Sequence, residues 1–256
     1  MTETLQVDVS NPGQVFACLG LLEVLDLFAP GSEGAFASER EFQVRSGATL
    51  ARALESVAAA KAREEHPHPD PPPWGGDKAW PVVLDGGFGS LVLDPWLEPD
   101  HGGTSKGLKL WAGRVDTLEL VRGLLKAIPA AGHRPMRGVF EWEASGTPTG
   151  LDMRSAVSKE DLGYSYNSQN LKPVLYPVVD TFAMIGLEAA RPPRTGALTY
   201  RYSLWTQPLP PVIARATLAG KIPSLAASRW VYRVESRGLG GTYRYLSQSN
   251  PEEMQP

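Results

Sequence analysis

The chain has 256 residues, of which 42% are hydrophobic and 21% are charged, with a formal net charge of −3. This length allows a sizeable core in one domain or two small ones, and the composition excludes disordered and fibrous classes. A lone cysteine, Cys18, excludes an internal disulfide and fits a reducing compartment, and no apolar run reaches the roughly 18–20 residues that span a membrane. Because the N-terminus also lacks a basic region followed by an apolar run, we expect a soluble, cytoplasmic protein without a signal peptide.

The first predicted elements are a strand and a long helix. Residues 5–9 alternate apolar and polar side chains, as in a half-buried strand. Asn11 is a favourable N-cap and Pro12 a favourable first helical residue, and apolar residues follow at mostly helical spacing. The Pro-Gly pair at 30–31 then ends the helix, so we expect it over about residues 12–28.

The middle of the chain is predicted to contain two helices, two short strands and a proline-rich insertion. An alanine-rich helix is expected over 49–62 and another helix over 108–128. Between them, residues 82–84 and 91–93 have the pattern of short strands. Repeated prolines in 63–80 exclude both a helix and a central strand, so we expect a mobile or surface insertion there.

The second half is predicted to add a helix and late strands. Residues 139–143 alternate like a strand, and Pro177 opens a helix over 177–190. Residues 197–205 and 230–234 show the two-residue period of strands. We therefore expect an α+β fold, with mixed helices and an antiparallel sheet late in the chain.

A weak internal repeat is visible in two of the predicted helices. The pattern Phe-Ala-x-x-Gly-Leu occurs at residues 16–21 and 182–187, each time with proline near the helix start. Glycine inside a helix costs about 1 kcal/mol relative to alanine, so it usually allows another backbone to approach. Either two related halves pack through these helices, or the match is accidental. We expect a single compact unit over 1–256, with two lobes, 1–130 and 131–256, as the alternative.

Charge is divided unevenly between the two halves. Residues 1–100 hold 16 acidic and 6 basic residues, whereas residues 101–256 hold 12 acidic and 19 basic ones. From 191 to 250, nine basic residues accompany a single acid, Glu235. Arginine attracts phosphate and aromatic rings stack on unpaired bases, so this composition predicts a nucleic-acid surface. The alternative is a sheet with arginines on its solvent face and aromatic residues in its core. The interleaved aromatic residues are Tyr200, Tyr202, Trp205, Trp230, Tyr232, Tyr243 and Tyr245.

No catalytic or metal-binding arrangement can be read from the sequence. His66 and His68 stand two residues apart, but no cysteine lies near them to complete a metal site. The glycine-rich segment 238–245 lacks the Lys-Ser/Thr pair of a phosphate-binding loop. We therefore expect no enzymatic activity, no cofactor and no metal.

Two polar stretches are predicted to contact nucleic acid. Residues 102–114 bring basic side chains and a tryptophan together after a Gly-Gly pair. Residues 150–172 are rich in Tyr, Asn and Gln, which can contact base edges and phosphates. A surface connection ordered by tyrosine packing is the alternative for the second stretch. With two arginines from the basic segment, the candidate nucleic-acid-binding residues are Lys106, Lys109, Trp111, Arg114, Arg154, Lys159, Tyr164, Tyr166, Asn167, Gln169, Asn170, Lys172, Arg191 and Arg194.

Sequence blocks in a fixed order, spanning roughly residues 8–195, give the chain a family resemblance. The blocks are residues 11–14 (NPGQ), 20–23 (GLLE), 93–96 (LDPW), 109–113 (KLWAG), 150–155 (GLDMRS), 176–177 (YP), 185–187 (IGL) and 191–192 (RP). In this order they resemble the short CRISPR-associated large-subunit proteins of the subtype I-U (also called I-G) surveillance complex, Cascade. The chain departs from that pattern at Pro95, where the family has a second tryptophan beside Trp96.

The resemblance implies a non-catalytic subunit of an RNA-guided antiviral defence complex. Such large subunits lie near the 5′ end of the guide RNA, contact the backbone subunits and help to recognise the short duplex motif beside the target, the PAM. The implied partners are guide RNA, the target DNA duplex, the other Cascade subunits and a recruited helicase-nuclease. No membrane is involved.

Two other functions remain open from the sequence. The first is a protein-interaction scaffold within such a complex, with its basic face turned to solvent. The second is a CRISPR RNA-processing nuclease. Binding that falls steeply with salt separates nucleic-acid binding from the scaffold. Cleavage of a guide precursor that is lost on His133→Ala would indicate the nuclease.

Overall fold

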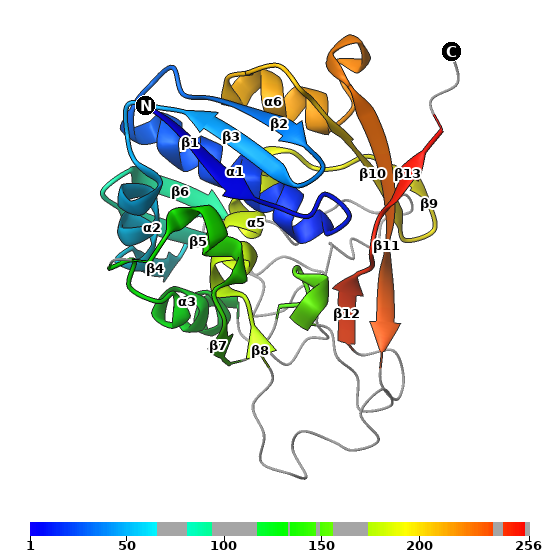
Figure 1. Ribbon diagram of the computed structural model, residues 1–256. Coiled ribbons are helices and arrows are strands. Elements are labelled where there is room, and N and C mark those ends of the chain that lie inside the picture. Colours follow the sequence, from blue (N-terminus) through cyan, green and yellow to red (C-terminus); the bar gives the residue numbers. More distant parts are fainter. Residues whose placement is uncertain are drawn as a thin grey trace.

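Helices and several small antiparallel sheets make up a mixed α+β fold, which confirms the predicted fold class (Figure 1). This computed structural model is described for residues 1–65, 81–93, 117–132, 134–146, 149–155, 174–237 and 243–253.

The first sheet has three antiparallel strands in the order β1-β3-β2, and it lies beside the long helix α1 (Figure 1). Asn11 caps α1 by accepting a hydrogen bond from the N–H of Gly13, and Pro12 occupies the first helical position. These elements are β1 (Thr2–Gln6), α1 (Pro12–Phe28), β2 (Glu33–Ser38) and β3 (Glu41–Arg45).

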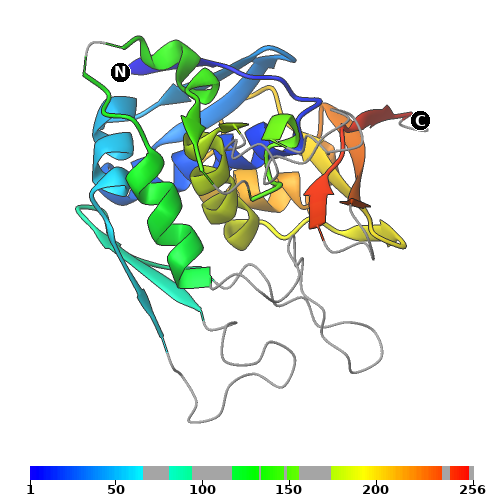
Figure 2. The ribbon, with the colours of Figure 1, turned by 90° about the horizontal axis from the view of Figure 1, so that it is seen from below.

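A second three-stranded sheet, in the order β4-β5-β6, follows next to the two short helices α2 and α3 (Figure 2). Thr49 begins α2 by accepting a hydrogen bond from the N–H of Arg52. The elements are α2 (Leu50–Ala58), β4 (Lys61–Glu64), β5 (Val82–Gly86), β6 (Gly89–Leu93) and α3 (Thr117–Ala127).

The second half contains the central helix α5 and an antiparallel sheet in the order β12-β11-β10-β9, with β13 also paired to β11. A two-stranded pairing of β7 with β8 precedes α5. The elements are η2 (Met136–Glu141), β7 (Ala144–Ser145), η3 (Met153–Ser155), β8 (Val174–Leu175), α5 (Pro177–Ala189), β9 (Arg194–Gly196), β10 (Thr199–Leu204), α6 (Pro211–Leu218), η5 (Pro223–Leu225), β11 (Ser228–Arg237), β12 (Tyr243–Leu246) and β13 (Asn250–Glu252).

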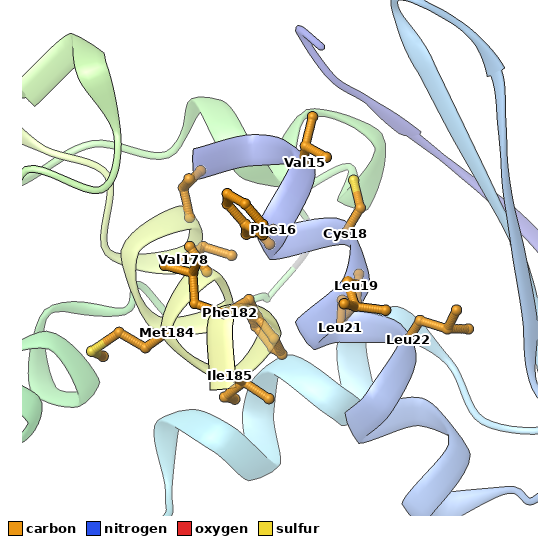
Figure 3. Packing of buried hydrophobic residues seen from close by; sticks show 14 of the residues in the cluster. Val15, Phe16, Cys18, Leu19, Leu21, Leu22, Val178, Phe182, Met184 and Ile185 are labelled. Atoms are coloured by element: carbon orange, nitrogen blue, oxygen red, sulfur yellow. The ribbon is translucent and has the colours of Figure 1, made fainter. Parts of the chain in front are cut away.

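The centre of the fold is the crossing of α1 and α5, which Figure 3 shows from close by. A Cβ added to Gly20 would lie 1.9 Å from the carbonyl oxygen of Phe182, and one added to Gly186 would lie 1.9 Å from that of Phe16. The repeated Phe-Ala-x-x-Gly-Leu pattern therefore forms the contact between the two helices. In each helix the glycine of the pattern packs against the phenylalanine carbonyl of the other helix. Both helices are buried around most of their circumference, since they lie inside one core cluster that draws on both halves.

The order of elements around the two helices is also alike. An antiparallel hairpin and then a shorter helix follow α1, as β2, β3 and α2. The same succession follows α5, as β9, β10 and α6. The resemblance between the halves thus extends beyond the six-residue pattern that the sequence shows.

Several predicted boundaries are confirmed. The helix expected over 12–28 spans Pro12–Phe28, and the one expected over 177–190 spans Pro177–Ala189. The late strand segments are also present, as β10 with the neighbouring β9 and as part of β11. Within the helix expected over 108–128, the described part from residue 117 is helical, as α3.

Three predictions are wrong in detail. The strand expected over 5–9 is instead β1, which begins at Thr2 and ends at Gln6. After the end of β1, the N–H groups of Val7 and Val9 donate to the carbonyls of Arg40 and Glu39. The helix expected over 49–62 ends at Ala58, because the residues from 61 pair with β5 as strand β4. The strand expected over 139–143 is instead the 3₁₀ helix η2.

The fold also contains elements that the sequence patterns did not predict. These include β2, β3, α6, β12 and β13, together with the short elements β7, β8, η3 and η5. Most of the proline-rich insertion expected at 63–80 lies outside the described residues, although residues 63–64 belong to β4 and the N–H of Glu65 donates to the carbonyl of Pro81.

Candidate nucleic-acid interface

Most aromatic residues of the C-terminal sheet point into the core. In the register of β10 and β11, Tyr200 lies opposite Tyr232 and Tyr202 lies opposite Trp230, and all four are buried. The ring centroid of Phe16 in α1 lies 5.9 Å from that of Tyr202 and 6.1 Å from that of Tyr232, both in edge-to-face geometry. These rings cannot stack on bases, so the described sheet matches the alternative of core aromatics beneath an arginine-bearing surface.

Arginines occupy the opposite face of the same strands. Because side chains alternate along a strand, Arg229 and Arg233 of β11 and Arg201 of β10 point away from α1. Arg233 is exposed, whereas Arg201 and Arg229 are half-buried. The 3₁₀ helix η3 borders this face, because its Met153 and Arg154 line the same groove as Val231 and Arg233.

Acids from other segments balance part of the positive charge. Arg215 of α6 lies 2.8 Å from the carboxylate of Glu23 in α1, and Arg201 lies 3.2 Å from that of Glu252 in β13. Arg191 lies 3.2 Å from the carboxylate of Glu188, one helical turn earlier. The surplus of basic residues between 191 and 250 is therefore smaller in space than along the sequence.

A groove of about 730 Å³ opens beside β11. Its lining includes the guanidinium-bearing Arg233 and three side chains that donate and accept hydrogen bonds, Ser247, Gln248 and Asn250. Neither Arg233 nor the neighbouring Arg229 forms an ion pair within the described part of the chain. The lining also includes Arg154, Glu235 and Glu252, so the groove combines charges of both signs with uncharged hydrogen-bonding groups.

Arg154, a predicted nucleic-acid contact, is held inside the protein. Its Nε and one Nη donate to the buried carboxylate of Asp152, its other Nη lies 2.7 Å from Glu141, and the first Nη also donates to the carbonyl oxygen of Phe140. The guanidinium stacks on the ring of Tyr176, with its carbon 3.6 Å from the ring centroid. Burial alone would lower the pKa of Arg154, but the hydrogen bonds and charge of Asp152 outweigh it and raise the pKa. Arg154 therefore joins the 149–155 turn to η2 and to the start of α5.

A pair of fully buried carboxylates lies directly behind Arg154. The Oδ1 atom of Asp180 accepts hydrogen bonds from the hydroxyl of Thr149 and from the N–H of Asp152, whereas its buried Oδ2 has no partner within the described residues. Burial, and next the charge of Asp152, raise the pKa of Asp180 to about 7. The side-chain amide of Asn11 donates to Asp152, 2.9 Å away, so the cluster links the N-termini of α1 and α5.

The remaining predicted contacts divide into two groups. Arg191 and Arg194 are exposed beyond the C-terminus of α5. They lie about 20 Å from the N-terminal end of α5, where Arg154 sits, given a rise of about 1.5 Å per residue, so the structure does not bring the three together. The predicted contacts that lie outside the described residues are Lys106, Lys109, Trp111, Arg114, Lys159, Tyr164, Tyr166, Asn167, Gln169, Asn170 and Lys172.

The sequence reasoning did not select Arg229, Arg233, Gln248 and Asn250 as candidate contacts. A signal for two of them was present, because Arg229 and Arg233 alternate with Trp230 and Tyr232 and must face the other way in a strand. No sequence pattern places Gln248 and Asn250 beside them, since that neighbourhood follows from the pairing of β13 with β11.

Within the described ranges, no three His, Cys, Asp or Glu side chains are grouped so that they could hold a metal ion. None of the described helices is both long enough and apolar enough to span a membrane.

Comparison with known proteins yields no match. No protein family, no curated protein and no solved structure is significantly similar to this chain.

Proposed function

We propose that this chain is a non-catalytic nucleic-acid-binding subunit of an RNA-guided CRISPR interference complex, contacting the guide RNA and the duplex motif beside the target. The ordered blocks from NPGQ to GLDMRS and onward support the choice of complex. In this proposal guide–target pairing reads the sequence, and a separate helicase-nuclease cuts the target.

One structural observation carries the proposal that the chain binds nucleic acid. The outward face of β10 and β11 exposes arginine on a sheet whose other face is packed against α1. Arg229 and Arg233 have no carboxylate partner among the described residues, although acids from elsewhere pair with Arg191, Arg201 and Arg215. Unpaired arginines on an open sheet face are suited to phosphate contacts.

The buried acid pair has a structural use in this proposal. Asp152 and Asp180 are both fully buried, and their hydrogen bonds go to Asn11, Thr149 and Arg154. General acid–base chemistry requires a carboxyl group within hydrogen-bond reach of a substrate, and a fully enclosed pair does not meet that requirement.

The test is binding of the purified full-length chain to fluorescent single-stranded RNA and to duplex DNA over a series of salt concentrations. We expect the logarithm of the binding constant to fall linearly with the logarithm of salt, because phosphate contacts release counterions. If neither probe binds at the lowest salt while circular dichroism shows a folded chain, the proposal is wrong.

A protein-interaction scaffold in the same complex is the second candidate, and the inward-facing aromatic residues favour it. Tyr200, Tyr202, Trp230 and Tyr232 are unavailable as stacking platforms. A scaffold would join the other subunits without binding either probe. Co-purification with those subunits after ribonuclease treatment, together with no binding of RNA or DNA, would replace the first proposal with this one.

A further inference from the structure

We infer that the groove beside β11 is where the sugar-phosphate backbone of a nucleic-acid strand lies, contacted without regard to base sequence. The inference rests on the proposed function and gives it a location that the sequence patterns did not indicate. Arg233 of β11 lines the groove together with Ser247, Gln248 and Asn250 from the chain around β13. Arg229 lies outside this lining, on the same face of β11 and opposite Glu252 of β13.

Strand pairing places these residues next to one another. Asn250 lies opposite Val231, midway between Arg229 and Arg233 along β11. The hydroxyl of Ser247 accepts a hydrogen bond from the N–H of Arg233 at 3.0 Å, which fixes the 247–249 turn against the strand. Arg229 and Arg233 are four residues apart on one face of β11, so about 13 Å of strand separates them at about 3.3 Å per residue, and Asn250 lies beside the middle of that interval.

The lining of the groove carries charges of both signs, Arg154 and Arg233 against Glu235 and Glu252, and ion pairs occupy several of these groups. Glu252 is paired with Arg201, with 3.2 Å between guanidinium nitrogen and carboxylate oxygen. The carboxylate of Glu235 accepts a hydrogen bond from the hydroxyl of Tyr245 at 2.5 Å. Arg229 and Arg233 have no such ionic partner among the described residues, so two guanidinium groups stand against the single carboxylate of Glu235.

The same geometry indicates backbone contact rather than recognition of bases. Stacking needs an exposed aromatic face, and four rings of the sheet, those of Tyr200, Tyr202, Trp230 and Tyr232, are turned inward. Tyr245 also lines the groove, where its hydroxyl donates to Glu235. Arginine, asparagine, glutamine and serine side chains all donate hydrogen bonds to phosphate oxygens. RNA and DNA both present phosphate oxygens, so the binding experiment compares RNA probes with DNA probes.

The decisive variants change charge at the groove and at a matched distant site. Arg229→Ala/Arg233→Ala removes two positive charges from the outward face. Its control, Arg40→Ala/Arg45→Ala, removes two from the N-terminal half. Binding of single-stranded RNA, single-stranded DNA and duplex DNA is measured for the full-length chain over a salt series, with melting temperature recorded for each variant.

We expect the groove variant to bind about tenfold more weakly than the parent at moderate salt, with little change in preference between base sequences. The salt slope for single strands should flatten by about 1.4, because each lost phosphate contact removes about 0.7. The control pair should change both quantities far less.

A gain of affinity is the complementary expectation. Glu235→Gln removes a negative charge that has no ion pair among the described residues, and its amide oxygen can still accept the Tyr245 hydrogen bond. It should bind more tightly than Glu39→Gln, which removes an exposed acid from the other half.

The outcomes separate this inference from the proposed function. If the parent binds but both groove variants behave like their controls, the strand lies elsewhere and the inference fails while the proposed function stands. If the parent binds none of the three probes, the proposed function fails as well. The probe whose affinity falls most in Arg229→Ala/Arg233→Ala identifies the bound nucleic acid as RNA, single-stranded DNA or duplex DNA.

Discussion

Gly20 of α1 packs against the backbone carbonyl of Phe182 in α5, and Gly186 of α5 packs against that of Phe16 in α1. Figure 3 shows this crossing with Phe16 and Phe182 labelled. A methyl group on either glycine would stand 1.9 Å from that oxygen, far inside van der Waals contact. The two helices can cross at this separation only because neither residue has a side chain.

Replacing Gly20 with alanine should therefore destabilise the protein by about 1–3 kcal/mol through overpacking, against the gain in helix propensity. Chemical denaturation of the variant measures this. Gly123→Ala is the matched control, because Gly123 lies within α3 and a Cβ there would meet nothing within 4 Å. That control should be stabilised by about 0.5–1 kcal/mol. Equal effects of the two substitutions would contradict the close crossing.

Asp180 should make stability depend on pH. Its pKa is raised to about 7 in the folded protein from an ordinary 3.8, because it is buried and lies beside Asp152. Because the folded protein holds the Asp180 proton more tightly than the unfolded chain does, protonation of Asp180 stabilises the fold. This stabilisation is complete below about pH 4 and is lost as pH rises through 7. In Asp180→Asn the amide oxygen can still accept from Thr149 and from the N–H of Asp152, but it does not ionise.

The difference in unfolding free energy between Asp180→Asn and the parent should therefore shift in favour of the variant by on the order of 3 kcal/mol between pH 5 and pH 8. Denaturation curves across that range measure the shift. Glu39→Gln, an exposed acid away from the cluster, should keep a constant difference from the parent. A pH-independent difference for Asp180→Asn would mean that Asp180 is ionised throughout.

Arg154 should act on stability rather than on the number of phosphate contacts. Arg154→Ala leaves the fully buried Asp152 without its guanidinium partner and removes the stack on Tyr176. We expect a loss of about 3 kcal/mol, because removing one member of a buried pair leaves an uncompensated charge. Arg137→Ala, which breaks the exposed pair with Glu41, should cost less than about 1 kcal/mol.

The salt dependence of RNA binding distinguishes the two roles of Arg154. If Arg154 only positions other groups, its removal leaves the salt slope of single-stranded RNA binding unchanged in the folded protein. If it contacts phosphate, its removal flattens that slope by about 0.7. A reduced slope with unchanged melting temperature would restore Arg154 as a direct contact.

Tyr202 should stabilise the contact between the segment after β1 and the C-terminal sheet. Its buried hydroxyl donates to the carbonyl of Val9 at 2.6 Å and also contacts the hydroxyl of Ser249. Tyr202→Phe should cost about 1–2 kcal/mol, because the Val9 carbonyl loses a donor inside the core. Tyr245→Phe removes an exposed hydrogen bond to Glu235 and should cost a few tenths of a kcal/mol. Similar losses in the two variants would contradict a stabilising contact at Tyr202.

Local signals in the sequence determined the two central helices. Asn11 and Pro12 define the start of α1, and the Pro-Gly pair at 30–31 follows its end, because capping and fixed backbone angles act within one turn. Pro177 does the same for α5. The alternation of aromatic and basic residues likewise predicted β10 and β11, since side chains on successive strand residues face opposite sides.

Long-range pairing decided what the local patterns could not. The alanine-rich segment after Thr49 has helical propensity through residue 62, yet residues 61–64 form β4 because β5 offers them a complete set of strand partners. Residues 139–143 alternate like a strand, but Val139 and Phe140 are adjacent and both buried, which a 3₁₀ turn permits and a one-faced strand does not.

The candidate site shows the same division. The amino-acid sequence alone establishes that the C-terminal half is rich in arginine, and strand alternation places Arg229 and Arg233 on one face. Only the tertiary structure decided which arginines are neutralised, since Glu23 reaches Arg215 from 192 residues away in the sequence and Asp152 holds Arg154 inside the protein. Charge balance depends on distance in space, which composition along the chain does not record.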